Sequence, residues 1–155
     1  MKSSPSLNAA PLVSDWVALE DGEVIVHTGK VDIGQRIGTA LRGIVADELG
    51  VAIEKVRVAP VDTDRSPDEG YTSGSNSIEQ SGSALTAAAA TARHVLVKRA
   101  AQLLDVSADS LELIDAAFRA PLHNRSISLW EANEAGALDV PVNPDAAEVG
   151  SFTGP

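Results

Sequence analysis

The sequence predicts an α+β domain in which a small mixed sheet is packed by two main helices. Three observations point to this fold: an Asp-Gly pair between two alternating apolar runs, a helical apolar pattern that ends at a glycine, and a long alanine-rich segment. Alternation with a period of two is typical of strands, whereas apolar residues three and four positions apart are typical of a helix packed on one side. At 155 residues, the chain is long enough for one modest core.

The first half of the chain carries the strand signals. Apolar residues alternate on both sides of Asp21-Gly22, so strands are expected over about residues 15–19 and 23–29. Asp-Gly is favoured in two-residue hairpin turns because both turn positions need a positive φ. A third strand is expected over about residues 55–61, where valines alternate with other residues up to a proline.

Two helices are predicted to pack against this sheet. The first starts near Ile37 and stops at Gly50, a residue type that commonly ends helices. Its apolar face is formed by Leu41, Ile44, Val45 and Leu49. The second extends over about residues 83–104, with Ser77 or Ser81 as its N-cap. Its apolar face is formed by Leu85, Val95, Leu96, Leu103 and Leu104. Its alanines favour helix formation and close packing, so we expect it to be buried along much of its length.

The segment after the second helix contains shorter elements. Strands are expected over residues 111–114 and 117–120. Residues 126–130 then lead into a short polar helix near 128–135. The sheet and helix content therefore continues beyond the two main helices.

Composition divides the chain into three parts. Residues 1–14, rich in Ser, Pro and Ala, are expected to form an N-terminal arm, and residues 15–136 the α+β domain. Residues 137–155 are rich in Pro and Gly near their end and show no periodicity, so we expect an extended C-terminal tail.

A glycine-containing corner joins the second expected strand to the first helix. It includes Gly29, Gly34 and Gly38. Glycines let a backbone approach a ligand closely, and the first turn of a helix offers unpaired N–H groups to an anion. Turn geometry alone explains the same glycines. Gln35 has two interpretations as well, because its amide can either donate to a ligand oxygen or face solvent.

A second candidate segment is the long loop over residues 62–82. Long loops inside a compact domain are more often functional than filler, although this Ser- and Gly-rich composition also suits a flexible linker. Its position between a strand and a long helix favours function. The hydroxyls of Ser73, Ser75 and Ser77 are expected to be ligand donors, since no Gly-x-Ser-x-Gly nucleophile motif is present. The acidic residues of this loop lack EF-hand spacing and indicate a solvated surface.

Composition excludes several classes of function. The formal net charge of −10, from 22 acidic and 12 basic residues, opposes general binding to nucleic acid or acidic membranes. Without cysteine, the chain cannot itself hold a disulfide or a cysteine-ligated iron–sulfur cluster. His27, His94 and His123 share no metal-ligand spacing, so no metal ligand is predicted. The first residues lack an apolar segment and a twin-arginine pair, so a cytoplasmic protein is expected, with the periplasm left open.

Several motifs occur together in an order and spacing that resemble one known family. They are residues 26–35 (VHTGKVDIGQ), 44–49 (IVADEL), 61–63 (VDT) and 67–77 (PDEGYTSGSNS). Over about residues 14–104 the chain resembles the molybdopterin-binding large subunit of the xanthine dehydrogenase and aldehyde oxidase family. The similarity is greatest to the nicotinate dehydrogenase and isoquinoline oxidoreductase branch.

The resemblance implies specific cofactor contacts. The residues that correspond to the molybdopterin dinucleotide contacts are Gly34 and Gln35 at the corner, and Gly74, Ser75, Asn76 and Ser77 in the loop. Ile33 is expected to touch the cofactor through its backbone. Arg36 departs from the family pattern, since many relatives have a second glycine there. It either adds a charge toward the pyrophosphate or reshapes the corner.

The resemblance also implies that this chain is incomplete as an enzyme. Large subunits of the family are several times longer, and the glutamate that acts as base lies outside the match, so no catalytic residue is predicted here. The similarity is interpreted as covering their N-terminal portion, as in a split or truncated large subunit. The implied cofactor is molybdopterin cytosine dinucleotide with molybdenum, shared with the remaining large-subunit polypeptide, and [2Fe–2S] clusters are implied on an iron–sulfur partner.

Three functions are therefore compared. The first is a part of the molybdenum-cofactor cradle of a hydroxylase that oxidises an N-heterocycle or an aldehyde with water-derived oxygen. The second is a non-catalytic interaction module that kept the fold and lost the cofactor. The third is a stand-alone binder of a phosphate-bearing ligand, which ranks last because the sequence has no complete nucleotide-binding motif.

Overall fold

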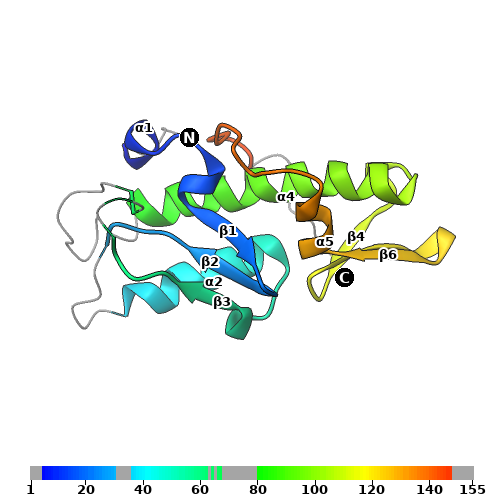
Figure 1. Cartoon of the computed structure of the whole chain (residues 1–155), viewed down its shortest axis with the longest axis horizontal. Helices are drawn as coiled ribbons and strands as arrows, with labels where there is room; N and C mark the ends of the chain where they lie inside the picture. Colours follow the sequence, from blue (N-terminus) through cyan, green and yellow to red (C-terminus); the bar gives the residue numbers. More distant parts are fainter. Residues whose placement is uncertain (1–4, 31–35, 63, 65, 68–79, 148–155) are drawn as a thin grey trace.

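The fold consists of two small sheets that lie side by side along one long helix (Figure 1). It is seen in a computed structural model that describes residues 5–30, 36–62, 64, 66–67 and 80–147. The long helix is α4 (Gly82–Leu104), and the first half of the chain adds α2 (Ile37–Leu49) beside it. The predicted α+β class is confirmed, and the sheet content is larger than expected because the second half of the chain forms a sheet of its own.

The first sheet is mixed, as predicted. Strand β1 (Val17–Glu20) pairs antiparallel with β2 (Glu23–Val26), and β2 pairs parallel with β3 (Val56–Val58). The predicted hairpin turn is confirmed, because Asp21 and Gly22 have φ values of 50° and 77°. Valines and leucines of the three strands face α2 and α4, whereas Ala18, Ile25 and Arg57 share the row that faces the other way.

Helix α2 connects the two parallel strands and has the predicted bounds. Its residues Ile37, Leu41, Val45 and Leu49 are buried, with exposed fractions of 0–2%. Gly50 ends the helix at a φ of 60°, as expected for a glycine C-cap. The side chain of Arg42 ties the helix to the strand, donating from Nε to the Val56 carbonyl at 2.6 Å and from Nη2 to the Ile53 carbonyl at 2.9 Å.

Helix α4 is buried along much of its length, as predicted. Leu85, Leu96 and all four alanines of residues 87–90 are fully or almost fully buried. The prediction that Leu103 belongs to the apolar face is wrong, since its exposed fraction is 54%. Alanines carry the buried face instead, because they let α2 and both sheets approach closely. Ser81 occupies the N-cap position, but its side chain makes no capping hydrogen bond.

A buried ion pair joins the two main helices. Arg93 of α4 lies 3.1 Å from Glu48 of α2, measured from Nη1 to Oε2, and the exposed fractions of the two side chains are 6% and 22%. Most of the remaining contact between these helices is apolar. Loss of either partner would be costly, since it would leave the other charge unpaired at this depth.

The second sheet is antiparallel. It contains β4 (Glu112–Ile114), β5 (Ala117–Ala120) and β6 (Arg125–Ser128), in that order. The predicted strands before residue 121 are confirmed. The segment expected over residues 126–130 forms β6 and then α5 (Leu129–Glu134), where Ser128 and Glu131 form a capping box.

The two ends of the described chain lie against each other. The arm segment contains helix α1 (Ser6–Ala9) and the single turn η1 (Val13–Asp15), and it pairs with the tail through an isolated bridge between Leu12 and Pro141. The Trp16 indole donates from Nε1 to the Ala10 carbonyl at 2.8 Å. Both ends thus contribute to the core. Among the described residues, no helix is long and apolar enough to cross a membrane.

Candidate functional site

The candidate site lies at the edge where the two parallel strands end. Val26 and Val58 are the last residues of β2 and β3, and they are directly paired in the ladder. The Ala59 amide still donates to the Val26 carbonyl at 2.9 Å, so both chains leave the sheet side by side. We refer to this region as the strand-end edge. It is where ligands bind in many folds with parallel strands.

Both candidate loops begin at the strand-end edge. The chain after β2 passes through the corner into α2, and the chain after β3 passes through the long loop into α4. The N-terminal ends of these two helices lie at the same end of the molecule, on the left of Figure 1. The structure therefore brings together the two strand ends and the two helix starts that border the predicted contacts.

The predicted contact residues lie outside the described residues. They are Ile33, Gly34, Gln35, Gly74, Ser75, Asn76 and Ser77. The described residues that border them are Lys30 and Arg36 for the corner, and Pro67 and Gln80 for the loop. The contacts themselves remain predictions, and the structure describes the residues that border them.

Arg36 holds the left-handed backbone conformation that glycine favours. Its φ and ψ are 55° and 34°, and it occupies the N-cap position of α2. An L-residue pays about 1–2 kcal/mol for this conformation. The family resemblance places a glycine at this position in many relatives, and the backbone geometry gives a physical reason for that choice. Arg36 keeps the turn and presents an exposed side chain there.

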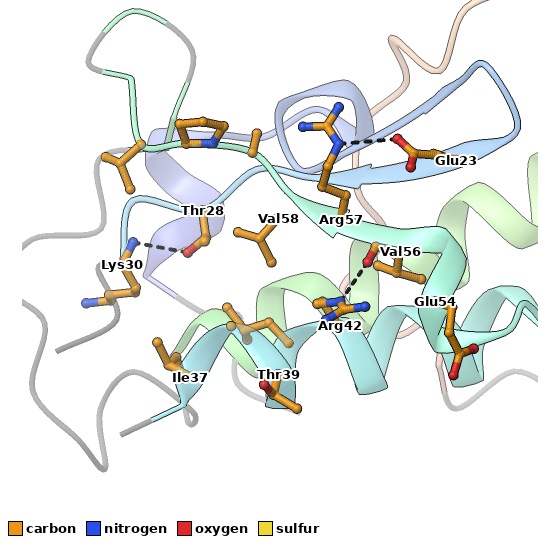
Figure 2. Close-up of a pocket in the computed structure, with 15 residues that line it drawn as sticks. Glu23, Thr28, Lys30, Ile37, Thr39, Arg42, Glu54, Val56, Arg57 and Val58 are labelled. Carbon is orange, nitrogen blue, oxygen red and sulfur yellow. Dashed lines mark hydrogen bonds and ion pairs between the residues drawn. The ribbon is translucent and has the colours of Figure 1, made fainter. Parts of the chain in front are cut away.

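A cavity of about 620 Å³ runs between α2 and β3 and reaches the strand-end edge (Figure 2). Its lining includes Thr28 and Lys30 after β2, Gly38 in the first turn of α2, and Val58 in β3. Thr28 and Lys30 are 1% and 3% exposed, and the Lys30 amide donates to the Thr28 hydroxyl at 3.1 Å. Figure 2 shows Lys30 and Ile37 at the same end of the cavity, next to the corner.

The charges around this cavity are compatible with an anionic ligand at the corner. Neither α2 nor α4 has an acidic residue in its first turn, so no carboxylate within these two turns offsets the positive end of the helix dipole. Lys30 adds a positive charge beside the corner. Glu23 also lines the cavity, but it pairs with Arg57 at 3.2 Å toward the outer face of the sheet. Phosphate oxygens are the kind of group that this arrangement favours.

Gly38, on the cavity wall, has room for a Cβ atom. A Cβ built on Gly38 would lie 3.9 Å from Val58 Cγ2, which is an ordinary van der Waals distance. The fold itself therefore does not require glycine at this position. Gly43, further along α2, has nothing within 4 Å of such a Cβ.

Other polar groups in the described part of the chain have structural roles. The Asp62 carboxylate accepts from the Asp64 amide at 2.9 Å, which makes a local turn at the start of the long loop. The pKa of Glu131 is lowered because its carboxylate accepts from the Ser128 backbone amide and interacts with the Ser128 hydroxyl. Among the residues that the structure describes, no group of three or more His, Cys, Asp and Glu side chains could hold a metal ion.

Sequence reasoning did not single out Thr28 and Lys30 as wall residues. Both lie beside Gly29 in the motif that carries the resemblance, and this position in the motif is the sequence feature that could have indicated them. Lysine is rarely buried. Its burial here is a feature of the tertiary structure, which the local sequence does not reveal.

Comparison with known proteins identifies the family. The family model for the molybdopterin cofactor-binding domain matches residues 13–154. The chain is 35% identical over 112 residues to a nicotinate dehydrogenase subunit of Pseudomonas putida, covering 72% of this chain and 9% of that protein. It is 34% identical over 110 residues to the gamma subunit of the 6-hydroxypseudooxynicotine dehydrogenase complex of Paenarthrobacter nicotinovorans, covering 71% and 14%.

A third relative has a name that points to another cofactor. It is the membrane-bound aldehyde dehydrogenase [pyrroloquinoline-quinone] of Gluconacetobacter polyoxogenes, 38% identical over 95 residues, with 61% of this chain and 12% of that protein covered. The chain thus spans between 9% and 14% of the length of these three relatives.

Solved structures share the fold. The Cu,Mo-CO dehydrogenase superposes with a TM-score of 0.67 at 24% identity, covering 81% of this chain and 17% of that chain. Quinoline 2-oxidoreductase from Pseudomonas putida 86 gives a TM-score of 0.61 at 23% identity, covering 77% and 15%. The match to the family model shows that the chain belongs to the molybdopterin cofactor-binding domain family, in agreement with the resemblance to the xanthine dehydrogenase type.

Proposed function

We propose that this chain supplies part of the molybdenum-cofactor cradle of a multi-subunit molybdenum hydroxylase. The observation that carries the proposal is the convergence of two strand ends and two helix starts at the strand-end edge, where both candidate loops begin. Two loops that leave one edge and enter adjacent helices can enclose an extended dinucleotide from two sides. The acid-free first turns and Lys30 favour the phosphates of such a ligand.

The proposed contacts follow the family pattern. Gln35 and the backbone of Ile33 and Gly34 would hold the ligand from the corner. The residues that would hold it from the loop are Gly74, Ser75, Asn76 and Ser77. We propose molybdopterin cytosine dinucleotide as the form bound. When bound, the cofactor supplies the redox chemistry of hydroxylation, and the residues of this chain bind it and orient it.

The substrate class proposed is an N-heterocycle or an aldehyde, with the inserted oxygen derived from water. Nicotinate dehydrogenase and quinoline 2-oxidoreductase are named for N-heterocycles, and a third protein is named for aldehydes. The remaining large-subunit polypeptide would complete the cradle and supply the catalytic base. Because the chain contains no cysteine, [2Fe–2S] clusters would be held by a partner.

The test is the cofactor content of the complex that forms around the tagged chain in its own cell. We expect molybdenum and pterin in amounts close to one per chain. Gln35→Ala and Ser75→Ala should each lower both contents, because they remove donors from opposite sides of the ligand. A complex free of molybdenum and pterin would overturn the proposal. Pyrroloquinoline quinone found in their place would instead align the chain with its aldehyde dehydrogenase relative.

A non-catalytic interaction module is the second candidate. The observation that favours it is Arg36, which places a long charged side chain at a corner where the resemblance indicates glycine in many relatives. This candidate predicts a stable complex in which Gln35→Ala and Ser75→Ala change neither the cofactor content nor the activity. The same two variants therefore separate the two functions.

A further inference from the structure

An exposed leucine stands out at the tip of the hairpin formed by β5 and β6. Leu122 has an exposed fraction of 90%, compared with 54% for Leu103 and 48% for Val61, the other exposed large apolar side chains of the described residues. We refer to residues 117–128 as the Leu122 hairpin. A single exposed leucine is common in proteins, so its surroundings must decide whether it has a role.

The Leu122 hairpin holds the backbone of this residue in a defined turn. Residues Pro121–His123 form one turn of 3₁₀ helix, and Asn124 closes it in the left-handed conformation with its amide donating to the Pro121 carbonyl at 3.3 Å. Arg125 donates from Nη1 to the Leu104 carbonyl at 2.7 Å, which fastens the hairpin to the end of α4. A loop whose backbone is preorganised loses less conformational entropy on binding than a flexible one.

The charge of the Leu122 hairpin is opposite to that of the whole chain. Residues 116–130 include Arg119, His123 and Arg125 and contain no aspartate or glutamate, whereas the chain as a whole has a net charge of −10. Arg119 and Arg125 border a hollow of about 460 Å³ on the outer face of the second sheet. Glu112, opposite Arg119 in the ladder, is the one carboxylate among the residues that line this hollow.

The Leu122 hairpin lies far from the strand-end edge. The edge adjoins the N-terminal end of α4, and the hairpin lies beside its C-terminal end, on the right of Figure 1. A helix of 23 residues is about 34 Å long at 1.5 Å per residue. The hairpin therefore belongs to a different surface from the candidate cofactor site.

We infer that the Leu122 hairpin docks into a carboxylate-rimmed apolar pocket on the polypeptide that supplies the remainder of the large subunit. The inference rests on the proposed function, because it needs a chain that is one part of a larger subunit. The chain spans only 9% and 14% of two relatives, so the missing polypeptide is large enough to reach both ends of α4. A second contact at the far end would fix the orientation of the cradle.

A second copy of this chain is a poor occupant. In a symmetric dimer built on this surface, the same basic patch of each copy would face the other. Like charges placed together oppose association. An acidic partner surface removes this repulsion and matches the basic hairpin.

The experiment is photocrosslinking in the complex purified from the native cell through a tag on this chain. A photoreactive amino acid replaces Leu122, and the same substitution at Leu103 serves as the control at an exposed leucine outside the hairpin. We expect position 122 to crosslink to the polypeptide that carries the remaining molybdopterin-binding sequence, at least tenfold more than position 103. Crosslinks to an iron–sulfur subunit, to a second copy, or to nothing would overturn the inference.

Three variants test the chemistry of the contact, with Leu103→Asp as the control. Leu122→Asp should lower the amount of copurified polypeptide at least tenfold, whereas Leu122→Met should retain it. Arg119→Glu should weaken the association and reduce its sensitivity to salt, because it removes a charge attraction. If Leu103→Asp and Leu122→Asp lower the amount of copurified polypeptide equally, the effect comes from adding a charge anywhere on this surface, and the role of the hairpin is overturned.

Molybdenum and pterin are measured in the same preparations. If they are present while Leu122 crosslinks to nothing, the docking inference fails and the cofactor proposal is retained. If molybdenum and pterin are absent while position 122 crosslinks to the expected polypeptide, the cofactor proposal fails and the docking inference is retained.

Discussion

Replacing Gly38 by alanine should separate the needs of the fold from the needs of the ligand. The added Cβ would lie 3.9 Å from Val58 Cγ2, so it fits the described fold without displacing a neighbour. Alanine is favoured over glycine in a helix by about 1 kcal/mol, and somewhat less in the first turn, where Gly38 lies. We therefore expect Gly38→Ala to raise the free energy of unfolding by a few tenths to about 1 kcal/mol.

Cofactor binding should respond in the opposite direction. The new methyl group projects from the cavity wall, and overpacking a tight contact costs about 1–3 kcal/mol. At about 1.4 kcal/mol per factor of ten, this lowers the affinity by about fivefold to a little over a hundredfold. The physical reason is that the ligand, unlike Val58, must approach the helix start closely to reach its N–H groups.

Gly43→Ala is the matched control. It lies in the interior of the same helix, gains at least as much helix propensity and has nothing within 4 Å of the added Cβ. Thermal unfolding of the 155-residue chain and molybdenum content of the assembled complex are measured for both variants. We expect both melting temperatures to rise, by about 2–4 °C for each kcal/mol, and the metal content to fall only for Gly38→Ala. Full cofactor content in Gly38→Ala would refute the close approach.

Three further predictions concern stability. Arg93→Ala should lower the free energy of unfolding, measured by urea denaturation, by about 3 kcal/mol, because it leaves the Glu48 carboxylate unpaired between two helices. Arg57→Ala, which breaks an exposed pair, should lower it by less than about 1 kcal/mol. Similar losses for the two variants would contradict the structural role of the buried pair. Arg36→Gly should stabilise the chain by about 1 kcal/mol by relieving the left-handed backbone, and Arg36→Ala, which keeps a Cβ, should not, as thermal unfolding would show. Folding lowers the pKa of Glu131 below its ordinary value of 4.5, so its contribution to the free energy of unfolding is present above that pH and is lost as the pH falls through the folded pKa. Glu131→Gln should remove this part of the pH dependence. Identical curves of stability against pH for the two proteins would count against this role.

Local patterns were sufficient for most secondary structure. The Asp21-Gly22 turn, the glycine stop at Gly50 and the alanine-rich helix each rest on the conformational preferences of a few neighbouring residues. The second sheet was harder to foresee, because its strands are short and Ala116 adopts a positive φ of 59° at the β4–β5 turn. The exposure of Leu103 was also missed, since periodicity does not show where a helix extends beyond the elements that pack against it.

The sequence by itself determined the α+β class, the two helices, the family and the residues expected to touch a cofactor. These follow from local preferences and from motifs whose spacing is written along the chain. Only the tertiary structure decided that β2 and β3 end side by side, that Lys30 is buried beside the corner, and that the Leu122 hairpin lies at the opposite end of α4. Strand register, burial and charge distribution depend on contacts between residues far apart in the chain, and no local pattern encodes them.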